Sequence, residues 1–272
     1  MFRTHHIESL DLPELSPYRT MKRPQAHRAQ GILVAEGEKV VRRLLESDFP
    51  VVSVLLPEKW LAELEPLLRA RPEDIPVYLV NKKQVLEELI GFSMFQGVMA
   101  IGRVPPPVSI EEVLAQGRPP RLFVAVDALT NAENLGVLVR NCVAFGAQAL
   151  VVGETSSSPF LRRAVRNSMG TIFQLPVVEP PDLVSALKEL QKLGVRIVAA
   201  HPRAAGRTLS QSDFARDCCL VFGSEGYGIT PAVLAVCDEA VAIPMPPTVD
   251  SLNVGSAAAV FLYEVNRQRT RT

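Results

Sequence analysis

The chain has 272 residues, of which 47% are hydrophobic and 21% are charged, and its formal net charge is zero. This composition is typical of a globular protein with a full core, and the length favours two domains over one. A neutral chain has no global attraction for nucleic acid, so any such surface must be a local patch. Because the N-terminus lacks the apolar core of a signal peptide and no apolar run reaches the ~18 residues of a membrane span, we expect a soluble, cytoplasmic protein.

The four cysteines are Cys142, Cys218, Cys219 and Cys237. They form no C-x-x-C pair, and no histidine lies at a spacing typical of zinc ligands. We therefore expect free, buried thiols in a reducing compartment, and no metal site.

The first hundred residues alternate short apolar runs with helical patterns. This alternation predicts a compact α/β domain over residues 1–103. The predicted strands are residues 32–35, 51–56, 77–80 and 98–101, and the predicted helices are residues 37–45, 58–68 and 82–90. Proline clusters then flank one short helix in residues 104–120, which predicts a semi-rigid connector.

Residues 17–43 of this domain are locally basic. Arg19, Arg23 and Arg28 are the candidate phosphate contacts for a bound nucleic acid. A solvated helical face is the alternative interpretation of the same charges.

The second half restarts the alternation and predicts a second α/β domain over residues 121–272. Near-continuous apolar strands separated by helices indicate a mostly parallel sheet that is covered on both faces. The predicted strands are residues 122–126, 149–152, 172–178, 195–200, 219–222 and 241–243. The predicted helices are one starting between residues 133 and 135 and stopped by Gly146, one with Pro159 in its first turn, one at residues 184–193, and one after Asp250 and Ser251, either of which can cap it.

Three stretches of this second domain have the residue types of a functional site. The first is Asn134-x-Gly136-x-x-x-Arg140, in which Gly136 and Arg140 share one helix face. A surface arginine beside a tolerated glycine is the alternative, although a glycine inside a helix costs about 1 kcal/mol relative to alanine and therefore suggests a packing or access reason.

The second stretch, residues 223–228, reads Gly-Ser-Glu-Gly-Tyr-Gly directly after a strand. It matches neither a dinucleotide fingerprint nor a Walker A loop, so it does not support an NAD or ATP site. A glycine-rich loop without a cation suits a ligand held by backbone groups, and a simple tight turn is the alternative.

The third stretch, residues 240–264, reads as a short strand, a proline-rich loop and a helix that begins with small residues. Pro244, Pro246 and Pro247 exclude a helix or a central strand from the loop. Ser251 and Asn253 then offer neutral groups that orient a ligand. The loop after a strand is where ligands bind in α/β domains.

Together these stretches resemble the SpoU branch of the SPOUT RNA methyltransferase superfamily, in the same order and at the same spacing across residues 121–266. The matching runs are N-x-G-x-x-x-R at 134–140, G-S-E-G at 223–226, I-P-M at 243–245 and S-L-N-V at 251–254. Residues 166–170 resemble a further family segment, and residues 17–103 resemble the ribosomal-protein-L30e-type substrate-binding domain that many members have. Ala132 departs from the family pattern, because proline is usual there.

The resemblance implies an RNA 2′-O-ribose methyltransferase that uses S-adenosylmethionine and has a C-terminal trefoil knot and a homodimeric assembly. It further implies that the cofactor pocket and the catalytic cluster lie in the loops of residues 121–272. The implied cofactor-binding residues are Gly223, Ile243, Met245 and Leu252, and the implied catalytic residues are Asn134, Arg140, Glu225, Ser251 and Asn253.

The expected substrate is ribosomal or transfer RNA, with ribosomal RNA favoured. Arg162, Arg163 and Arg166 would add to its phosphate contacts. The alternative from another class is a non-catalytic RNA-binding or ribosome-assembly protein that keeps the fold. Retention of the polar residues of all three stretches argues against that alternative, because binding alone does not require them.

Overall fold

The computed structural model describes residues 1–81, 97–202 and 207–270. The chain divides into two compact units, one made of residues 1–106 and 160–173 and the other of residues 107–159 and 174–272. The first crossing between the units, after residue 106, lies inside the predicted connector. The sequence patterns did not predict that residues 160–173 join the first unit.

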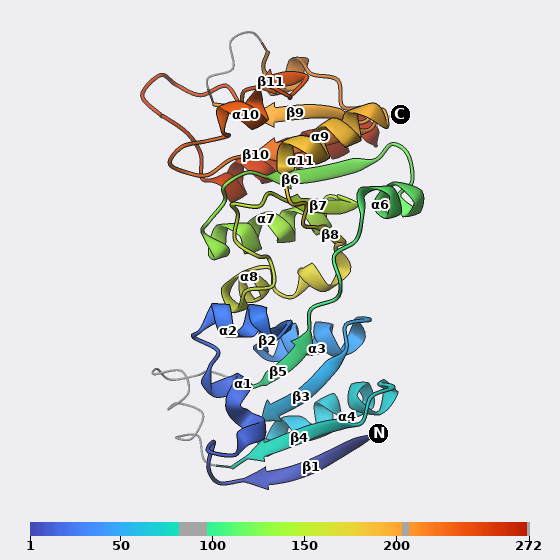
Figure 1. Ribbon diagram of the computed structural model, residues 1–272, viewed down its shortest axis with the longest axis vertical. Coiled ribbons are helices and arrows are strands. Elements are labelled where there is room, and N and C mark those ends of the chain that lie inside the picture. Colours follow the sequence, from blue (N-terminus) through green and yellow to red (C-terminus); the bar gives the residue numbers. More distant parts are fainter. Residues whose placement is uncertain (82–96, 203–206, 271–272) are drawn as a thin grey trace. The chain divides into compact units, whose positions relative to one another are not determined.

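The first unit contains a five-stranded mixed sheet with the strand order β1-β4-β3-β5-β2 (Figure 1). β5 runs antiparallel to β2 and β3, whereas the remaining pairs are parallel. The strands are β1 (Phe2–Ile7), β2 (Ile32–Glu36), β3 (Val51–Leu56), β4 (Ile75–Val80) and β5 (Met99–Arg103). The α-helices are α1 (Ser16–Arg19), α2 (Pro24–Ala29), α3 (Glu38–Glu46), α4 (Leu61–Ala70) and α8 (Arg162–Asn167), and 3-10 turns cover Pro13–Leu15 and Glu58–Trp60.

Most of the predicted elements of this unit are present. β3 has the predicted bounds, and α3 buries the four apolar residues of its predicted stripe, Val40, Val41, Leu44 and Leu45. β1 was not predicted, because it pairs only with β4 in the sheet and its residues 3–6 are exposed and polar. The predicted helix at residues 82–90 lies outside the described residues.

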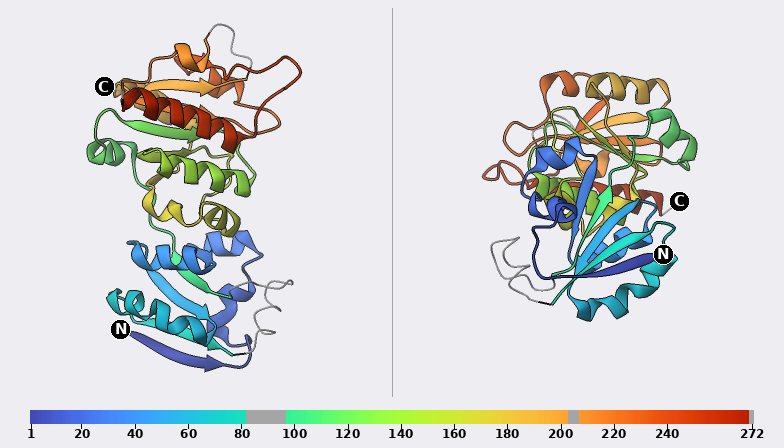
Figure 2. Two further views of the ribbon diagram at one scale, coloured as in Figure 1. Left: turned by 180° about the vertical axis from the view of Figure 1, so that it is seen from behind. Right: turned by 60° about the horizontal axis from the view of Figure 1, so that its bottom comes forward.

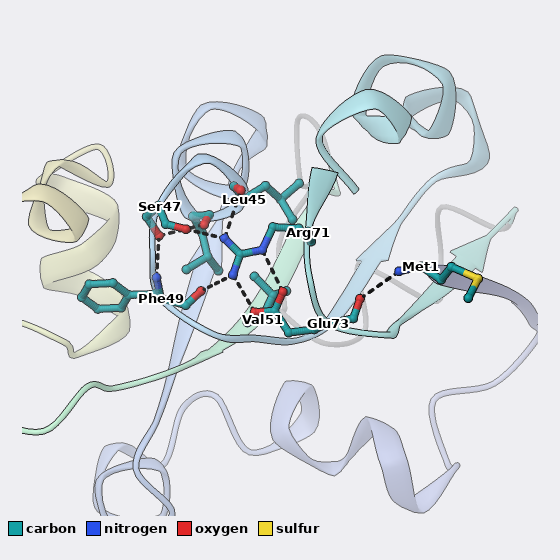
Figure 3. Close-up of polar contacts among 8 residues, drawn as sticks. Met1, Leu45, Ser47, Phe49, Val51, Arg71 and Glu73 are labelled. Carbon is teal, nitrogen blue, oxygen red and sulfur yellow. Dashed lines mark hydrogen bonds and ion pairs between the residues drawn. The ribbon is translucent and has the colours of Figure 1, made fainter. Parts of the chain in front are cut away.

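A buried arginine fastens the turn between α3 and β3 to the segment that leads into β4 (Figure 3). The Arg71 guanidinium donates to the backbone carbonyls of Leu45, Ser47 and Phe49, and it also binds both carboxylate oxygens of Glu73. Glu73 in turn accepts a hydrogen bond from the Val51 amide at 3.1 Å. The hydrogen bond from Arg71 lowers the pKa of Glu73 to about 2, against an ordinary value of 4.5.

The second unit contains a six-stranded sheet with the order β11-β9-β10-β6-β7-β8, and all its pairs are parallel. The predicted mostly parallel sheet is thus confirmed, whereas the trefoil knot stays a prediction. The strands are β6 (Leu122–Val126), β7 (Ala149–Val152), β8 (Val177–Val178), β9 (Arg196–Ala200), β10 (Cys218–Phe222) and β11 (Glu239–Val241). The α-helices are α6 (Ile110–Gln116), α7 (Ala132–Ala144), α9 (Leu183–Lys192), α10 (Pro231–Leu234) and α11 (Val254–Arg269), and 3-10 turns cover Thr171–Gln174, at the boundary of the two units, and Leu209–Gln211.

Helices cover both faces of this sheet. α6, α9 and α10 share one apolar cluster with alternate residues of the central strands, such as Phe123 and Val221. The intervening strand residues point to the opposite face, where Phe222 packs edge-to-face on Phe261 of α11. α11 lies beside α7, as Figure 2 shows in red and green. α6, predicted as part of a connector, therefore contributes to the core of the second unit.

Several element boundaries differ from the predictions; β11, for example, spans Glu239–Val241 instead of residues 241–243. α11 begins at Val254 and is capped by Asn253, not by Asp250 or Ser251, because the Asn253 carboxamide accepts from the Gly255 amide. α8 begins at Arg162, so Pro159 precedes it rather than occupying its first turn. The predicted strand at residues 172–178 is a 3-10 turn followed by the two-residue strand β8, and Pro176, which has no N–H, stands directly before that strand.

Among the described residues, none of the helices combines the length and apolar character that crossing a membrane requires.

Candidate active site

A tight loop follows β10 at the carboxyl edge of the parallel sheet. Ser224 and Gly228 exchange two backbone hydrogen bonds, both of 3.0 Å, which close the loop around Glu225, Gly226 and Tyr227. A side chain on Gly223 would collide with the Gly228 carbonyl carbon at 2.1 Å, so the closed loop requires glycine there. This position explains the first glycine of the motif as a condition for loop closure.

A second loop, residues 242–253, joins β11 to α11 and carries the three prolines. The Asn253 side chain begins the helix by accepting from the Gly255 amide at 2.9 Å. Gly255 itself packs against α7, since a Cβ there would lie 2.6 Å from Val137 Cγ1. Asn141 Nδ2 of α7 also donates to the Gly255 carbonyl at 2.7 Å. The small residues at the start of α11 therefore let this helix approach α7 closely.

A cavity of about 780 Å³ lies between these two loops, within the second unit. All four predicted cofactor-binding residues line it: Gly223, Ile243, Met245 and Leu252. Two of the predicted catalytic residues, Glu225 and Ser251, line it as well.

A chain of side-chain hydrogen bonds joins the two loops to α7. Asn253 Nδ2 donates to Asn134 Oδ1 at 3.0 Å, and Asn134 Nδ2 donates to Glu225 Oε1. Because Asn253 Oδ1 already caps α11, the chain runs in one direction and ends on the Glu225 carboxylate. The structure thus brings together four of the five predicted catalytic residues, three by these hydrogen bonds and Ser251 through the cavity wall.

Arg140 is the exception. Its side chain is exposed, is absent from the cavity wall, and makes no hydrogen bond or ion pair with the described residues. It lies six residues beyond Asn134 on α7, which is roughly 9 Å further along the helix axis. Within one chain, therefore, the structure does not place the predicted cation at the cavity.

Asp127, which the sequence reasoning missed, supports the tight loop of residues 223–228, the glycine loop. It directly follows β6, it is only 4% exposed, and its carboxylate accepts from the Thr230 amide at 2.7 Å. Its own amide donates to the Phe222 carbonyl at 2.9 Å. Asp127 thus fixes both ends of the loop, residues 222 and 230. An aspartate at the end of an apolar strand was the signal that could have identified it.

The predicted RNA-binding arginines fall into two groups, both in the first unit. Arg23 and Arg28 are exposed and form no ion pair with the described residues, and Arg163 is also exposed. Arg19 donates to the Leu10 carbonyl at 2.7 Å. Arg162 and Arg166 pair with the buried Glu36 carboxylate, at 2.5 Å and 3.2 Å. Arg162 and Arg166 therefore neutralise the buried carboxylate of Glu36, and the Arg162 side chain is largely shielded from solvent.

The cavity has the lining that a polar ligand with apolar parts requires. The backbone amides of Ile243, Met245 and Leu252 donate no hydrogen bond to the described residues, so they can donate to a ligand. Phe222, Val241 and Phe261 add apolar surface. Small-molecule sites combine a mainly apolar wall with a few such polar groups.

Possible metal ligands and thiols are also present in the described part of the chain. His, Cys, Asp and Glu side chains do not gather there in groups of three that could hold a metal ion. The four cysteines are free, as predicted, and three of them are buried. Burial raises the pKa of the Cys218 thiol to about 11 and that of the Cys237 thiol to about 12.

Comparison with known proteins identifies the family. Residues 121–263 match the model of the SpoU rRNA Methylase family. The chain belongs to the SpoU rRNA methylase family. This SpoU member is 33% identical over 264 residues to an uncharacterized tRNA/rRNA methyltransferase of Mycobacterium bovis, covering 94% of this chain and 90% of that one.

Solved structures share the fold of this SpoU member over nearly its whole length. The SpoU methyltransferase AviRb from Streptomyces viridochromogenes has a TM-score of 0.80 and 25% identity, covering 94% of this chain and 97% of that one. AviRb has also been solved in complex with the cofactor AdoMet, with a TM-score of 0.81 and 24% identity, covering 95% of this chain and 98% of that one. An RNA 2′-O ribose methyltransferase has a TM-score of 0.78 and 25% identity, covering 99% of this chain and 100% of that one.

Proposed function

We propose that this SpoU family member transfers a methyl group from S-adenosylmethionine to a ribose 2′-hydroxyl of ribosomal or transfer RNA. The observation that carries the proposal is the cavity between the glycine loop and residues 242–253, the proline loop. The hydrogen-bonded side chains of Asn253, Asn134 and Glu225 lie at its edge. Membership of the family and its similarity to the AdoMet-bound AviRb support it.

The residues of the cavity fit the proposed cofactor. Ile243, Met245 and Leu252 would hold it through their free backbone amides, and Gly223 keeps the opposite wall closed. When bound, S-adenosylmethionine supplies an electrophilic methyl group that needs no further activation by the protein. The protein's remaining task is to align the attacking oxygen with that methyl group, which is a large entropic contribution to the rate.

The polar side chains at the cavity edge would orient the ribose. Ser251 lines the cavity and offers a hydroxyl, whereas the carboxamides of Asn134 and Asn253 are each held by two hydrogen bonds. Side chains locked in this way lose little further freedom when a substrate binds. We assign Ser251 and Asn253 to holding the ribose and Glu225 to fixing Asn134.

Arg140 has a separate role in the proposal. A guanidinium stays protonated at ordinary pH, so it serves poorly as a base and well as a fixed charge that stabilises a developing alkoxide. An RNA phosphate would accept the proton. Arg140→Lys tests this assignment: we expect a large loss of kcat with S-adenosylhomocysteine binding unchanged. Near-normal turnover of this variant would show that bidentate contact by a guanidinium is not required.

We propose that a homodimer brings Arg140 into the reaction. Val137 on α7 and Val260 and Tyr263 on the adjacent α11 are 38%, 40% and 57% exposed, which is unusual for large apolar side chains on neighbouring helices. A second copy on this face would bury them and add its own Arg140 to the site. A mixture of inactive Arg140→Ala and Glu225→Gln chains should then regain activity, whereas a monomer by analytical ultracentrifugation would contradict the assembly.

The first unit is the proposed RNA-positioning domain, of the L30e type. Arg23 and Arg28 are exposed cations that form no ion pair with the described residues, so RNA binding should weaken modestly as salt rises. Binding indifferent to salt would contradict this patch.

Transfer of tritium from labelled S-adenosylmethionine into total RNA tests the whole proposal, with Asn134→Ala as the control. Nucleotide-resolution mapping of ribose methylation in cells with and without the protein then identifies the site. RNA binding without any transfer would favour the non-catalytic alternative.

A further inference from the structure

The tip of the glycine loop carries an aromatic side chain that neither the fold nor the cavity uses. Tyr227 is 97% exposed, more than any other large apolar side chain in the described part of the chain. Its hydroxyl makes no hydrogen bond with the described residues, and its backbone amide donates to Ser224 Oγ at 3.2 Å. A single exposed tyrosine is ordinary on a protein surface, so its position must carry the argument.

That position is fixed, and it is at the cavity. The two hydrogen bonds between Ser224 and Gly228 close the loop directly around Tyr227. Tyr227 lines the cavity and lies two residues after Glu225, which is anchored to Asn134. The backbone that carries the ring is therefore tied into the same hydrogen-bonded assembly as the proposed catalytic side chains.

The exposure of the ring separates two possible ligands. A small molecule enclosed by the cavity contacts interior walls such as Phe222 and Phe261, which are 2% exposed. Tyr227, a residue that is 97% exposed and yet borders the cavity, stands outside those walls, at the mouth. A substrate that presents a hydroxyl to the cavity must pass that mouth, and the rest of the substrate remains there.

The chemistry of the substrate supplies a partner for the ring. If the proposed function holds, the group at the mouth is a nucleotide, and its base has two flat faces. RNA-binding proteins recognise unpaired bases by stacking them on aromatic side chains, and each stack contributes about 1–3 kcal/mol. The exposed Leu252 of the proline loop, which also lines the cavity, adds apolar surface.

We infer that Tyr227 is a stacking platform for an unpaired base of the RNA at the mouth of the methyl-donor cavity. It positions the substrate and takes no part in the chemistry. This inference rests on the proposed function for its ligand.

Three variants test it: Tyr227→Ala, Tyr227→Phe, and Leu193→Ala as a control at a half-exposed apolar residue outside the cavity. The probe is a short single-stranded oligoribonucleotide containing 2-aminopurine, whose fluorescence falls on stacking. We expect Tyr227→Ala to weaken its binding and to raise the KM for total RNA by about 5- to 150-fold. Tyr227→Phe and Leu193→Ala should stay within about 3-fold of the wild type, because the ring and not the hydroxyl stacks.

Calorimetry with S-adenosylhomocysteine separates the alternatives. Its Kd should be unchanged in Tyr227→Ala, and a weaker Kd would show that the ring contacts the donor instead, which overturns the inference. The inference is also overturned if Tyr227→Ala binds the oligoribonucleotide as the wild type does, or if Tyr227→Phe weakens binding as much as Tyr227→Ala. If the wild type transfers no methyl group while Tyr227→Ala still loses RNA binding, the proposed function fails and the stacking platform stands.

Discussion

Gly223→Ala should open the loop that forms one wall of the proposed donor cavity while leaving the fold intact. A Cβ at residue 223 would lie 2.1 Å from the Gly228 carbonyl carbon and 2.3 Å from both the Gly228 oxygen and the Ile229 nitrogen. All three are backbone atoms, so no side chain can rotate away. The loop must therefore open to make room for the alanine side chain.

The cost follows from what the opening breaks. The two hydrogen bonds between Ser224 and Gly228 contribute about 1 kcal/mol each, so a loop that opens loses about 2 kcal/mol. Forcing the closed form instead would add a further 1–3 kcal/mol of overpacking. Ligand binding that requires the closed loop should therefore weaken by a factor of about 30 or more.

Calorimetry with S-adenosylhomocysteine measures this factor, and Gly226→Ala is the matched control. Gly226 lies in the same loop, a Cβ there meets nothing within 4 Å, and its φ is not in the left-handed region. We expect Gly226→Ala to bind within about 2-fold of the wild type. Circular dichroism and the thermal midpoint should show that both variants are folded. Wild-type affinity in Gly223→Ala would refute the closed loop as a wall of the donor site.

Three further predictions concern the rest of the chain. Arg71 lowers the pKa of Glu73, so the Glu73 carboxylate stabilises the fold fully above about pH 5 and progressively less down to pH 2. Allowing for the partial exposure of Glu73, we expect Glu73→Gln to remove about 2 kcal/mol from the change in unfolding free energy between these pH values, measured by urea unfolding. The Cys218 thiol, with its pKa raised to about 11 by burial, should react with a disulfide reagent at pH 8 only after unfolding, and fast reaction of the native protein would contradict its burial. Asn134→Asp places a second carboxylate against Glu225 and should reduce methyl transfer at least 10-fold, whereas an unchanged rate would show that the hydrogen bond from Asn134 Nδ2 is dispensable.

The sequence predicts elements well where one physical signal dominates. The strands at residues 51–56, 122–126 and 149–152 have their predicted bounds, because each is a short apolar run in a buried strand. The end of α7 is also as predicted, since Gly146 adopts a φ of +76° two residues after the last helical residue. In these places the local preference and the tertiary structure agree.

Prediction fails where the decisive contact is distant in sequence. The segment of residues 160–173 joins the first unit because Arg162 and Arg166 meet Glu36, more than 120 residues earlier. No local pattern can show that an arginine will neutralise a buried carboxylate rather than contact a phosphate. Similarly, Asn253 rather than Asp250 or Ser251 caps α11, and the same side chain donates to Asn134, which is 119 residues earlier.

The site itself shows why motif residues can be predicted while their roles cannot. Short motifs identify Gly223, Glu225 and Asn253 in the sequence. The structure brings the loops that carry them to one cavity. The structure adds that Gly223 allows the loop to close and that Glu225 accepts a hydrogen bond from Asn134. Two further side chains of these motif segments, Arg140 and Tyr227, are exposed in the single chain. Neither side chain has a hydrogen-bond or ion-pair partner among the described residues, and the partners that we propose for them are a nucleic acid and a second copy of the chain.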